Sequence, residues 1–87
     1  MVGNLAVSLA GHDKGQLYII IREEEEYVYL CDGNYKKLTD PKRKNKKHIQ
    51  IIKTDPGLEL KNRLRRQETV RDEEVKRAIK LYGIKDH

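Results

Sequence analysis

The sequence has one cysteine, no tryptophan, no phenylalanine and no long hydrophobic run. The single cysteine, Cys31, excludes an intrachain disulfide and a metal site built from paired cysteines, and it favours a reducing, cytoplasmic setting. The apolar run from Leu17 to Ile21 is too short for a membrane span, which takes roughly 20 residues. We therefore expect no membrane insertion. The three histidines also lack metal-ligand spacing, so we expect no bound metal and no cofactor.

Catalytic signatures are also missing. The sequence contains neither a glycine-rich nucleotide loop nor paired carboxylates placed for acid and base catalysis. An enzyme would have to use His12 or Cys31, and these side chains would have to meet in a pocket. Because a lone cysteine in an apolar strand is more often a small core residue than a nucleophile, we expect no enzymatic activity and no small-molecule substrate.

The sequence does have a concentrated positive charge. Lysine and arginine number 19 against 14 acidic residues, which gives a net charge of +5. Residues 36–48, the basic segment, hold seven basic residues and one aspartate, so this segment carries more surplus charge than the whole chain. A localised basic segment attracts polyanions, and nucleic acid is therefore the expected partner. The alternative is a flexible, solvated loop.

The hydrophobic pattern divides the chain in two. Residues 1–54 alternate with the period of strands, residues 55–87 follow the period of helices, and a Pro-Gly boundary falls at 54–57. The run 16–22 is apolar on both faces, which predicts a central strand. The predicted strands span 5–10, 16–22, 27–31, 35–38 and 47–52. Five short antiparallel strands are better closed into a small barrel than left open, because closure removes exposed edges.

Two details of these strands follow from residue spacing. Leu5, Val7 and Leu9 share one face of the first strand, which predicts a strand buried on this face alone. The third strand is followed by Asp32-Gly33-Asn34, a turn sequence whose glycine can adopt a positive φ. The third strand is therefore expected to end in a tight turn.

The C-terminal part predicts a helical extension of the barrel. One helix spans 57–67, and Thr69 is placed to cap a second helix, with Asp72 favourably close to its N-terminus. The second helix carries an apolar stripe, which must pack on another surface. The stripe consists of Val75, Ala78, Ile79 and Tyr82.

The turn Ala10-Gly11-His12-Asp13-Lys14-Gly15-Gln16 joins the first two predicted strands. Taken locally it is only a hairpin turn. With its flanking strands, from Leu5 to Ile21, it resembles the KOW motif of ribosomal and transcription-elongation proteins. The resemblance implies a small SH3-like barrel of five strands, whose glycine turn and neighbouring loops contact RNA. Gly15 would permit both the turn and a close approach to the RNA.

A longer resemblance covers most of the chain. It is carried by Tyr27–Gly33, Lys36–Leu38, Pro41–His48 and Asp72–Ile79. These segments are similar to small bacterial KOW-domain RNA-binding proteins, which are related to the large-subunit ribosomal protein family numbered fourteen in archaea and eukaryotes. The resemblance implies a ribosome-associated protein that binds ribosomal RNA in translation or ribosome assembly, with ribosomal proteins as further partners. The acidic run Glu23–Glu26 departs from the family pattern.

The candidate RNA-binding residues come from the glycine turn and the basic segment. They are His12, Lys14, Gly15, Tyr35, Lys36, Lys37, Lys42, Arg43, Lys44, Lys46, Lys47 and His48. Each cation that neutralises a phosphate releases counterions, which gives affinity for any RNA sequence. Arg43 can bind phosphate through two hydrogen bonds, and Tyr35 is the best candidate for stacking on an unpaired base. Most other tyrosines of the predicted barrel are expected to pack in the core. Electrostatic clamping of a structured RNA is the predicted mechanism.

The alternative function is a protein-interaction module of the NusG type, which docks on RNA polymerase or on ribosomal proteins. Its anchor would be the apolar stripe from Val75 to Tyr82. This alternative predicts that the stripe is exposed in the isolated protein. Packing of the stripe against the barrel would remove the surface on which the alternative depends.

Overall fold

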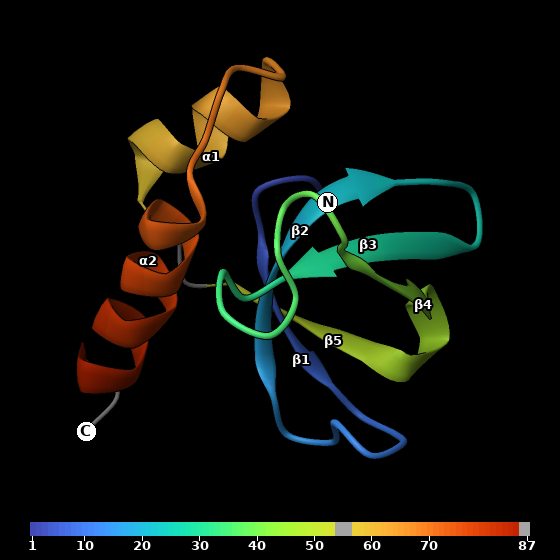
Figure 1. The fold of residues 1–87 in the computed structure, drawn as a ribbon. Coiled ribbons are helices and arrows are strands. Elements are labelled where there is room, and N and C mark those ends of the chain that lie inside the picture. The colour runs from blue at the N-terminus through green and yellow to red at the C-terminus, as the bar shows by residue number, and fades with distance from the viewer. Residues whose placement is uncertain (54–56, 86–87) are drawn as a thin grey trace.

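Alternating apolar residues in the first part of the chain form strands, and helices follow in the second part (Figure 1). The structure is a computed structural model that describes residues 1–53 and 57–85. Its elements are β1 (Leu5–Ser8), β2 (Leu17–Glu23), β3 (Tyr27–Cys31), β4 (Lys42–Asn45), a 3-10 helix (Lys46–His48), β5 (Ile49–Ile52), α1 (Leu58–Arg65) and α2 (Asp72–Lys85). The predicted class, mainly β with a helical extension, is confirmed. Of the predicted boundary, Thr54, Asp55 and Pro56 lie outside the described residues.

The five strands form one antiparallel sheet in the order β4-β3-β2-β1-β5. β2 is central, as its two apolar faces predicted, and it pairs with β1 on one side and with β3 on the other. No ladder between β4 and β5 occurs in the described part of the chain. The 3-10 helix joins these two outer strands directly, so the chain itself carries one edge of the sheet to the other.

Two apolar clusters lie on opposite faces of the sheet, because successive strand residues point to opposite sides. The helix core consists of Leu5, Ile19, Cys31, Leu64, Val75 and Ala78. The sheet core consists of Ala6, Tyr18, Ile20, Val28, Leu30 and Ile49. The helix core is covered by α1 and α2, whereas the buried members of the sheet core all come from strands. A sheet buried on both faces explains why β2 is apolar from Leu17 to Ile21.

The prediction that β1 is buried on one face only is wrong. Leu5 and Ala6 are both fully buried, because neighbouring residues of β1 enter the two different cores. The strand also ends at Ser8, and Leu9 is 44% exposed in the turn that follows. The observed strand is therefore shorter than the predicted strand 5–10, and it is buried on both faces.

The predicted fourth strand at 35–38 is also wrong. Two of its backbone N–H groups donate to carboxylates instead of to a neighbouring strand. Asp32 Oδ1 accepts hydrogen bonds from the backbone N–H groups of Asn34 and Lys36, and Asp72 Oδ1 accepts one from the N–H of Leu38. Such side-chain acceptors compete with sheet ladders. The fourth strand forms later, at Lys42–Asn45, inside the basic segment.

The second helix begins later than predicted. Thr69 does not cap it, because α2 starts at Asp72. The carboxylate of Glu74 accepts a hydrogen bond of 2.9 Å from the backbone N–H of Arg71, as in half of a capping box. Glu74 also binds the Arg63 guanidinium at 2.8 Å, which joins α1 to α2.

The apolar stripe of α2 packs on the sheet. Val75 is fully buried and Ala78 nearly so, both in the helix core, and Ile79 and Tyr82 pack against the same cluster. The stripe therefore packs on another surface, as predicted, and the exposed stripe that the NusG-type alternative requires is not found among the residues that the structure describes. The NusG-type alternative loses the anchor surface on which it depended.

The turn after β3 touches the backbone of α2. Gly33 adopts φ +77, as the sequence predicted, and a Cβ at this position would collide with the carbonyl oxygen of Asp72 and lie 2.9 Å from the amide nitrogen of Lys76. Only a glycine allows this approach. In Figure 1 the loop between β3 and β4 (green) accordingly runs beside α2.

We predict that Gly33→Ala destabilises the fold by about 3 kcal/mol or more, because an unfavourable φ adds to a backbone collision. The matched control is Gly15→Ala, whose φ is +88 but whose Cβ would meet nothing within 4 Å. The control should lose only about 1 to 2 kcal/mol. Urea unfolding of both variants provides the measurement, and equal losses would contradict the collision.

Candidate nucleic-acid interface

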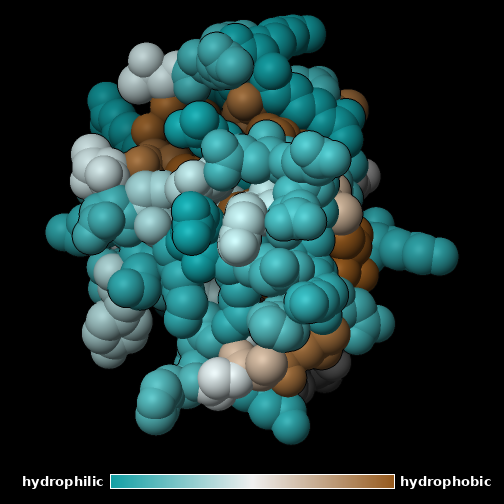
Figure 2. Space-filling view, turned by 90° about the vertical axis from the view of Figure 1, so that its right-hand side faces the viewer, coloured by the Kyte–Doolittle hydropathy of each residue, from teal (hydrophilic) through white to brown (hydrophobic). Residues whose placement is uncertain are grey.

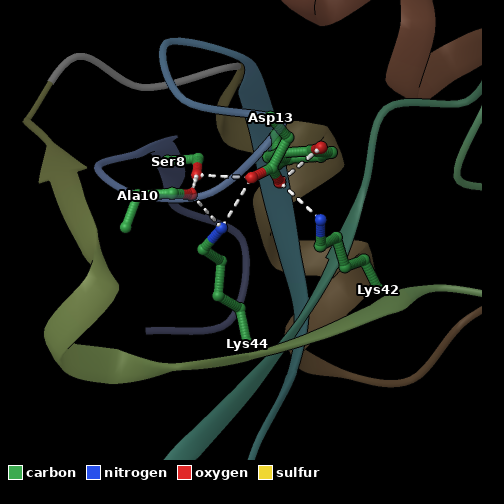
Figure 3. A network of polar contacts seen from close by, with 6 residues as sticks. Ser8, Ala10, Asp13, Lys42 and Lys44 are labelled. Atoms are coloured by element: carbon green, nitrogen blue, oxygen red, sulfur yellow. Dashed lines mark hydrogen bonds and ion pairs between the residues drawn. The ribbon is translucent and has the colours of Figure 1, made fainter.

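Four side-chain donors converge on the carboxylate of Asp13 in the glycine turn (Figure 3). The Ser8 hydroxyl donates at 2.8 Å and the Tyr18 hydroxyl at 2.9 Å. The ammonium groups of Lys44 and Lys42 lie 2.6 and 3.0 Å from its oxygens. Only 11% of the Asp13 side chain and 9% of the Lys44 side chain are exposed. Asp13 thus fastens the glycine turn to β1, β2 and β4 at once.

The register of β4 explains why two lysines of the basic segment point inward. Lys42 lies opposite Leu30, and Lys44 lies opposite Val28. Directly paired residues share a face of the sheet, so both lysines lie on the face of the sheet core. Their aliphatic stems cover apolar side chains while their ammonium groups reach Asp13.

Burial by itself would raise the pKa of Asp13. Hydrogen bonds from Lys44 and Lys42, followed by those from Ser8 and Tyr18, outweigh burial and hold the pKa of this carboxyl well below its usual range. Burial, and then the bond to Asp13, raises the pKa of Tyr18. Asp13 therefore stays ionised as the counter-ion of Lys44, and Tyr18 stays a neutral donor.

Other cations of the basic segment also have intramolecular partners. Lys46 binds Glu23 at 2.8 Å, and the Arg43 guanidinium lies over the ring of Tyr27, 4.4 Å from its centre. Residues 42–48 of the basic segment thus form an edge strand followed by a 3-10 helix, whereas residues 36–41 lie in the loop before this strand. Phosphate contacts by these residues stay predictions, and Lys44 has little exposed surface with which to make one.

A second group of the predicted cations has no ion pair with any described residue. It consists of Lys14, Lys36, Lys37 and Lys47. Lys14, Lys37 and Lys47 are exposed, and Lys36 is half-buried.

Figure 2 views the molecule from the side of β3 and β4 and shows a mostly hydrophilic face with small, separate apolar areas. This face offers charge and hydrogen bonding, not a broad apolar contact.

Tyr35 differs from the other tyrosines of the strand region. It is 86% exposed, whereas Tyr18 is buried and Tyr27 and Tyr29 are half-buried beneath arginines. Of the remaining three tyrosines, only Tyr18 is in the core, so the prediction that most would be core residues is wrong. Tyr27 and Tyr29 lie on the face of β3 opposite the sheet core, where Arg43 and Arg22 cover their rings.

Two shallow grooves meet at Tyr35. The turn-side groove lies between the glycine turn and the loop after β3, and it is lined by His12, Asp13, Gln16, Tyr18, Asp32, Tyr35, Lys36 and Lys42. The helix-side groove lies against α2 and is lined by Gly15, Gln16, Leu17, Asp32, Asn34, Tyr35, Lys76, Ile79 and Lys80. The fold therefore brings together His12, Gly15, Tyr35, Lys36 and Lys42 of the predicted site.

The remaining predicted site residues line neither groove. They are Lys14, Lys37, Arg43, Lys44, Lys46, Lys47 and His48. Conversely, Lys76 and Lys80 were not predicted. Their spacing of four residues puts them on one side of α2, next to Ile79 of the apolar stripe, and this spacing was the available signal.

Cys31 is a core residue. Its side chain is fully buried, and burial, followed by the negative charge of Asp72, raises the pKa of the thiol to about 12. The thiol is therefore neutral and inaccessible, while His12 is exposed at the turn. Among the described residues, no group of histidine, cysteine and acidic side chains could hold a metal, and no helix is long and apolar enough to cross a membrane.

No protein-family model and no curated protein matches the chain. The structural features that bear on its function are the Asp13 cluster, the displayed ring of Tyr35 and the two grooves beside it.

We predict that Asp13→Asn lowers the free energy of unfolding by about 3 kcal/mol near neutral pH, because it leaves a buried lysine without its counter-ion. A lowered carboxyl pKa stabilises the fold above the unfolded-state pKa, and this stabilisation is lost as pH falls. The difference between wild type and variant should therefore shrink below about pH 4. Urea titrations across this range measure it.

The control for this prediction is Lys14→Gln, which changes an exposed neighbour without an ion pair among the described residues. It should alter stability by no more than about 0.5 kcal/mol. A difference between wild type and Asp13→Asn that stays constant with pH would contradict the assigned role of the Asp13 charge.

Proposed function

We propose that this protein is a non-enzymatic RNA-binding protein of the KOW type, a small SH3-like barrel with a helical extension that binds ribosomal RNA. The observation that carries the proposal is the displayed ring of Tyr35, set between two grooves that bear Lys36, Lys76 and Lys80. An exposed aromatic ring among cations matches the two chemical features of RNA, base faces and phosphates.

The strand order supports an SH3-like barrel. β1 pairs with both β2 and β5, and the 3-10 helix connects β4 to β5. Asp13 adds a polar link between the glycine turn and β4, which lies at the other edge of the sheet from β5. We infer that such side-chain contacts, and not a ladder between β4 and β5, hold β4 against the turn between β1 and β2 in the barrel.

The glycine turn supports the KOW assignment. It makes a tight backbone structure, in which the N–H of Gly15 donates to the carbonyl of Ser8 and the N–H of Gln16 donates to that of Asp13. Gly15 lines the helix-side groove with open space above its Cα. This opening suits the close approach of an RNA backbone, which the resemblance to KOW proteins implies.

Ribosome association is the cellular part of the proposal and rests on the resemblance to the large-subunit ribosomal protein family numbered fourteen. We propose a cytoplasmic protein that acts in translation or ribosome assembly. Ribosomal proteins are proposed as further contacts. The acidic tip of the β2–β3 hairpin, Glu24–Glu26, is exposed and would face away from the RNA or toward basic partners.

We predict that replacing Lys36, Lys76 and Lys80 with glutamine weakens binding to purified large-subunit ribosomal RNA. Each lost phosphate contact should reduce the slope of log affinity against log salt by about 0.7 to 0.9, so three contacts reduce it by about 2 units or slightly more. Filter binding at several salt concentrations provides the slope.

The matched control replaces Lys53, Arg66 and Arg77 with glutamine. These residues are exposed and line neither groove, and the change in net charge is the same. The control should keep most of the wild-type slope. Equal slopes for both triple variants would mean that charge acts without a defined site, and an unchanged slope in the groove variant would count against the proposed interface.

We also predict that the tagged protein migrates with large ribosomal subunits in sucrose gradients of cell extract. The groove variant, with its three lysines replaced, should shift to the top of the gradient, because electrostatic contacts dominate affinity for RNA. The control triple variant should stay with the subunits. Migration of the wild type at the top of the gradient, at low salt, would exclude stable ribosome association.

A further inference from the structure

The loop that carries Tyr35 is held rigidly although its tip is exposed. Asp32 Oδ1 accepts two backbone hydrogen bonds, of 2.9 Å from Asn34 and 2.8 Å from Lys36. The backbone N–H groups of Asp32 and Gly33 both donate to the carbonyl of Lys36. Because Gly33 also lies against the backbone of α2, the loop is fixed at its base and closed on itself.

The ring of Tyr35 has no structural role in the described part of the molecule. The Tyr18 hydroxyl binds Asp13, the Tyr29 hydroxyl binds Glu24, and Arg43 covers the ring of Tyr27. Tyr35 has neither a hydrogen bond nor a ring contact with a described residue, and 86% of it is exposed. A rigid loop that displays an unused aromatic face is suited to stacking with a partner.

The surroundings of the ring favour a nucleotide as this partner. Lys76 and Lys80 line the helix-side groove one helical turn apart, where they can meet a phosphate. The groove is also lined by Gln16 and Asn34, whose amide groups can donate to and accept from the edge of a base. A cation pair, an aromatic face and two amides thus lie around one groove.

From this arrangement we infer that the helix-side groove binds one unpaired nucleotide of an RNA, with its base stacked on Tyr35 and its phosphate bound by Lys76 and Lys80. The inference rests on the proposed function and specifies its ligand as a bulged or looped-out base. The bases of an A-form duplex stack on one another and offer no free face, whereas an unpaired base can be splayed onto an aromatic ring. The protein therefore distinguishes an RNA with an unpaired base from a fully paired RNA, and charge alone does not decide binding.

The test compares two RNA hairpins whose stems differ by one bulged nucleotide. In both hairpins the loop is a non-nucleotide linker, so that the fully paired hairpin has no unpaired base. Tyr35→Ala should weaken binding to the bulged hairpin about 5- to 150-fold, the range for one base stacked on an aromatic ring. Binding to the paired hairpin should change by less than about twofold, because its contacts are phosphate contacts. Tyr35→Phe is the matched control and should behave like wild type, since it keeps the ring.

A direct readout of stacking is the fluorescence of 2-aminopurine at the bulged position. Wild type and Tyr35→Phe should quench this fluorescence, and Tyr35→Ala should not. Loss of both lysines, in Lys76→Gln with Lys80→Gln, should weaken both hairpins and reduce the salt slope.

The outcomes separate the inference from the proposed function. If wild type binds neither hairpin, RNA binding itself is wrong and Tyr35 is left as a contact for a protein. If wild type binds both hairpins equally and Tyr35→Ala changes neither, RNA binding stands and the nucleotide site is overturned. Equal losses on both hairpins would also overturn it, because stacking on an unpaired base cannot explain them.

Discussion

The packing of the glycine turn against β1, β2 and β4 depends on the contacts of the Asp13 carboxylate. The carboxylate lies in a turn, yet it binds donors from β1, β2 and β4, and two of these donors are lysine ammonium groups. A buried cation without its partner is strongly destabilising, so β4 can occupy its place only if the turn occupies its own. The wall of the turn-side groove, which includes Asp13 and Lys42, is therefore built by the same contacts that fix the fold.

Two further aspartates organise the other side of the grooves. Asp32 binds the backbone of the loop that displays Tyr35, and Asp72 binds the same loop from the first turn of α2. Both carboxylates accept hydrogen bonds from backbone N–H groups, which otherwise would need a neighbouring strand as their partner. The displayed ring thus depends on acidic residues, although the chain as a whole is basic.

Apolar periodicity in the sequence predicted much of the sheet, although it placed only one face of β1 in a core. Sequence patterns predicted β3 at its observed bounds, the central place of β2 and the turn at Gly33. They failed where polar side chains decide the structure. The run Lys42–Lys44 predicted side chains that neutralise RNA phosphates, because only the pairing with β3 shows that alternate lysines face the sheet core. Lys76 and Lys80 were missed because the sequence of α2 was considered only for its apolar stripe. Their proximity to Tyr35 depends on the loop after β3, whose conformation is fixed by hydrogen bonds to Asp32 and Asp72.

Some cations of the basic segment have intramolecular partners, whereas others have no ion pair with a described residue. On the proposed function, this difference affects which RNAs the protein prefers. Lys42, Lys44 and Lys46 form ion pairs within the chain, so their charge is partly neutralised before a ligand binds. A surface with fewer unpaired cations holds any polyanion less tightly, since affinity rises with each phosphate neutralised. A single stacking contact then makes up a larger share of the binding free energy. On the proposed function, the internal ion pairs of β4 would thereby favour RNAs that present an unpaired base to Tyr35 over RNAs that present phosphates alone.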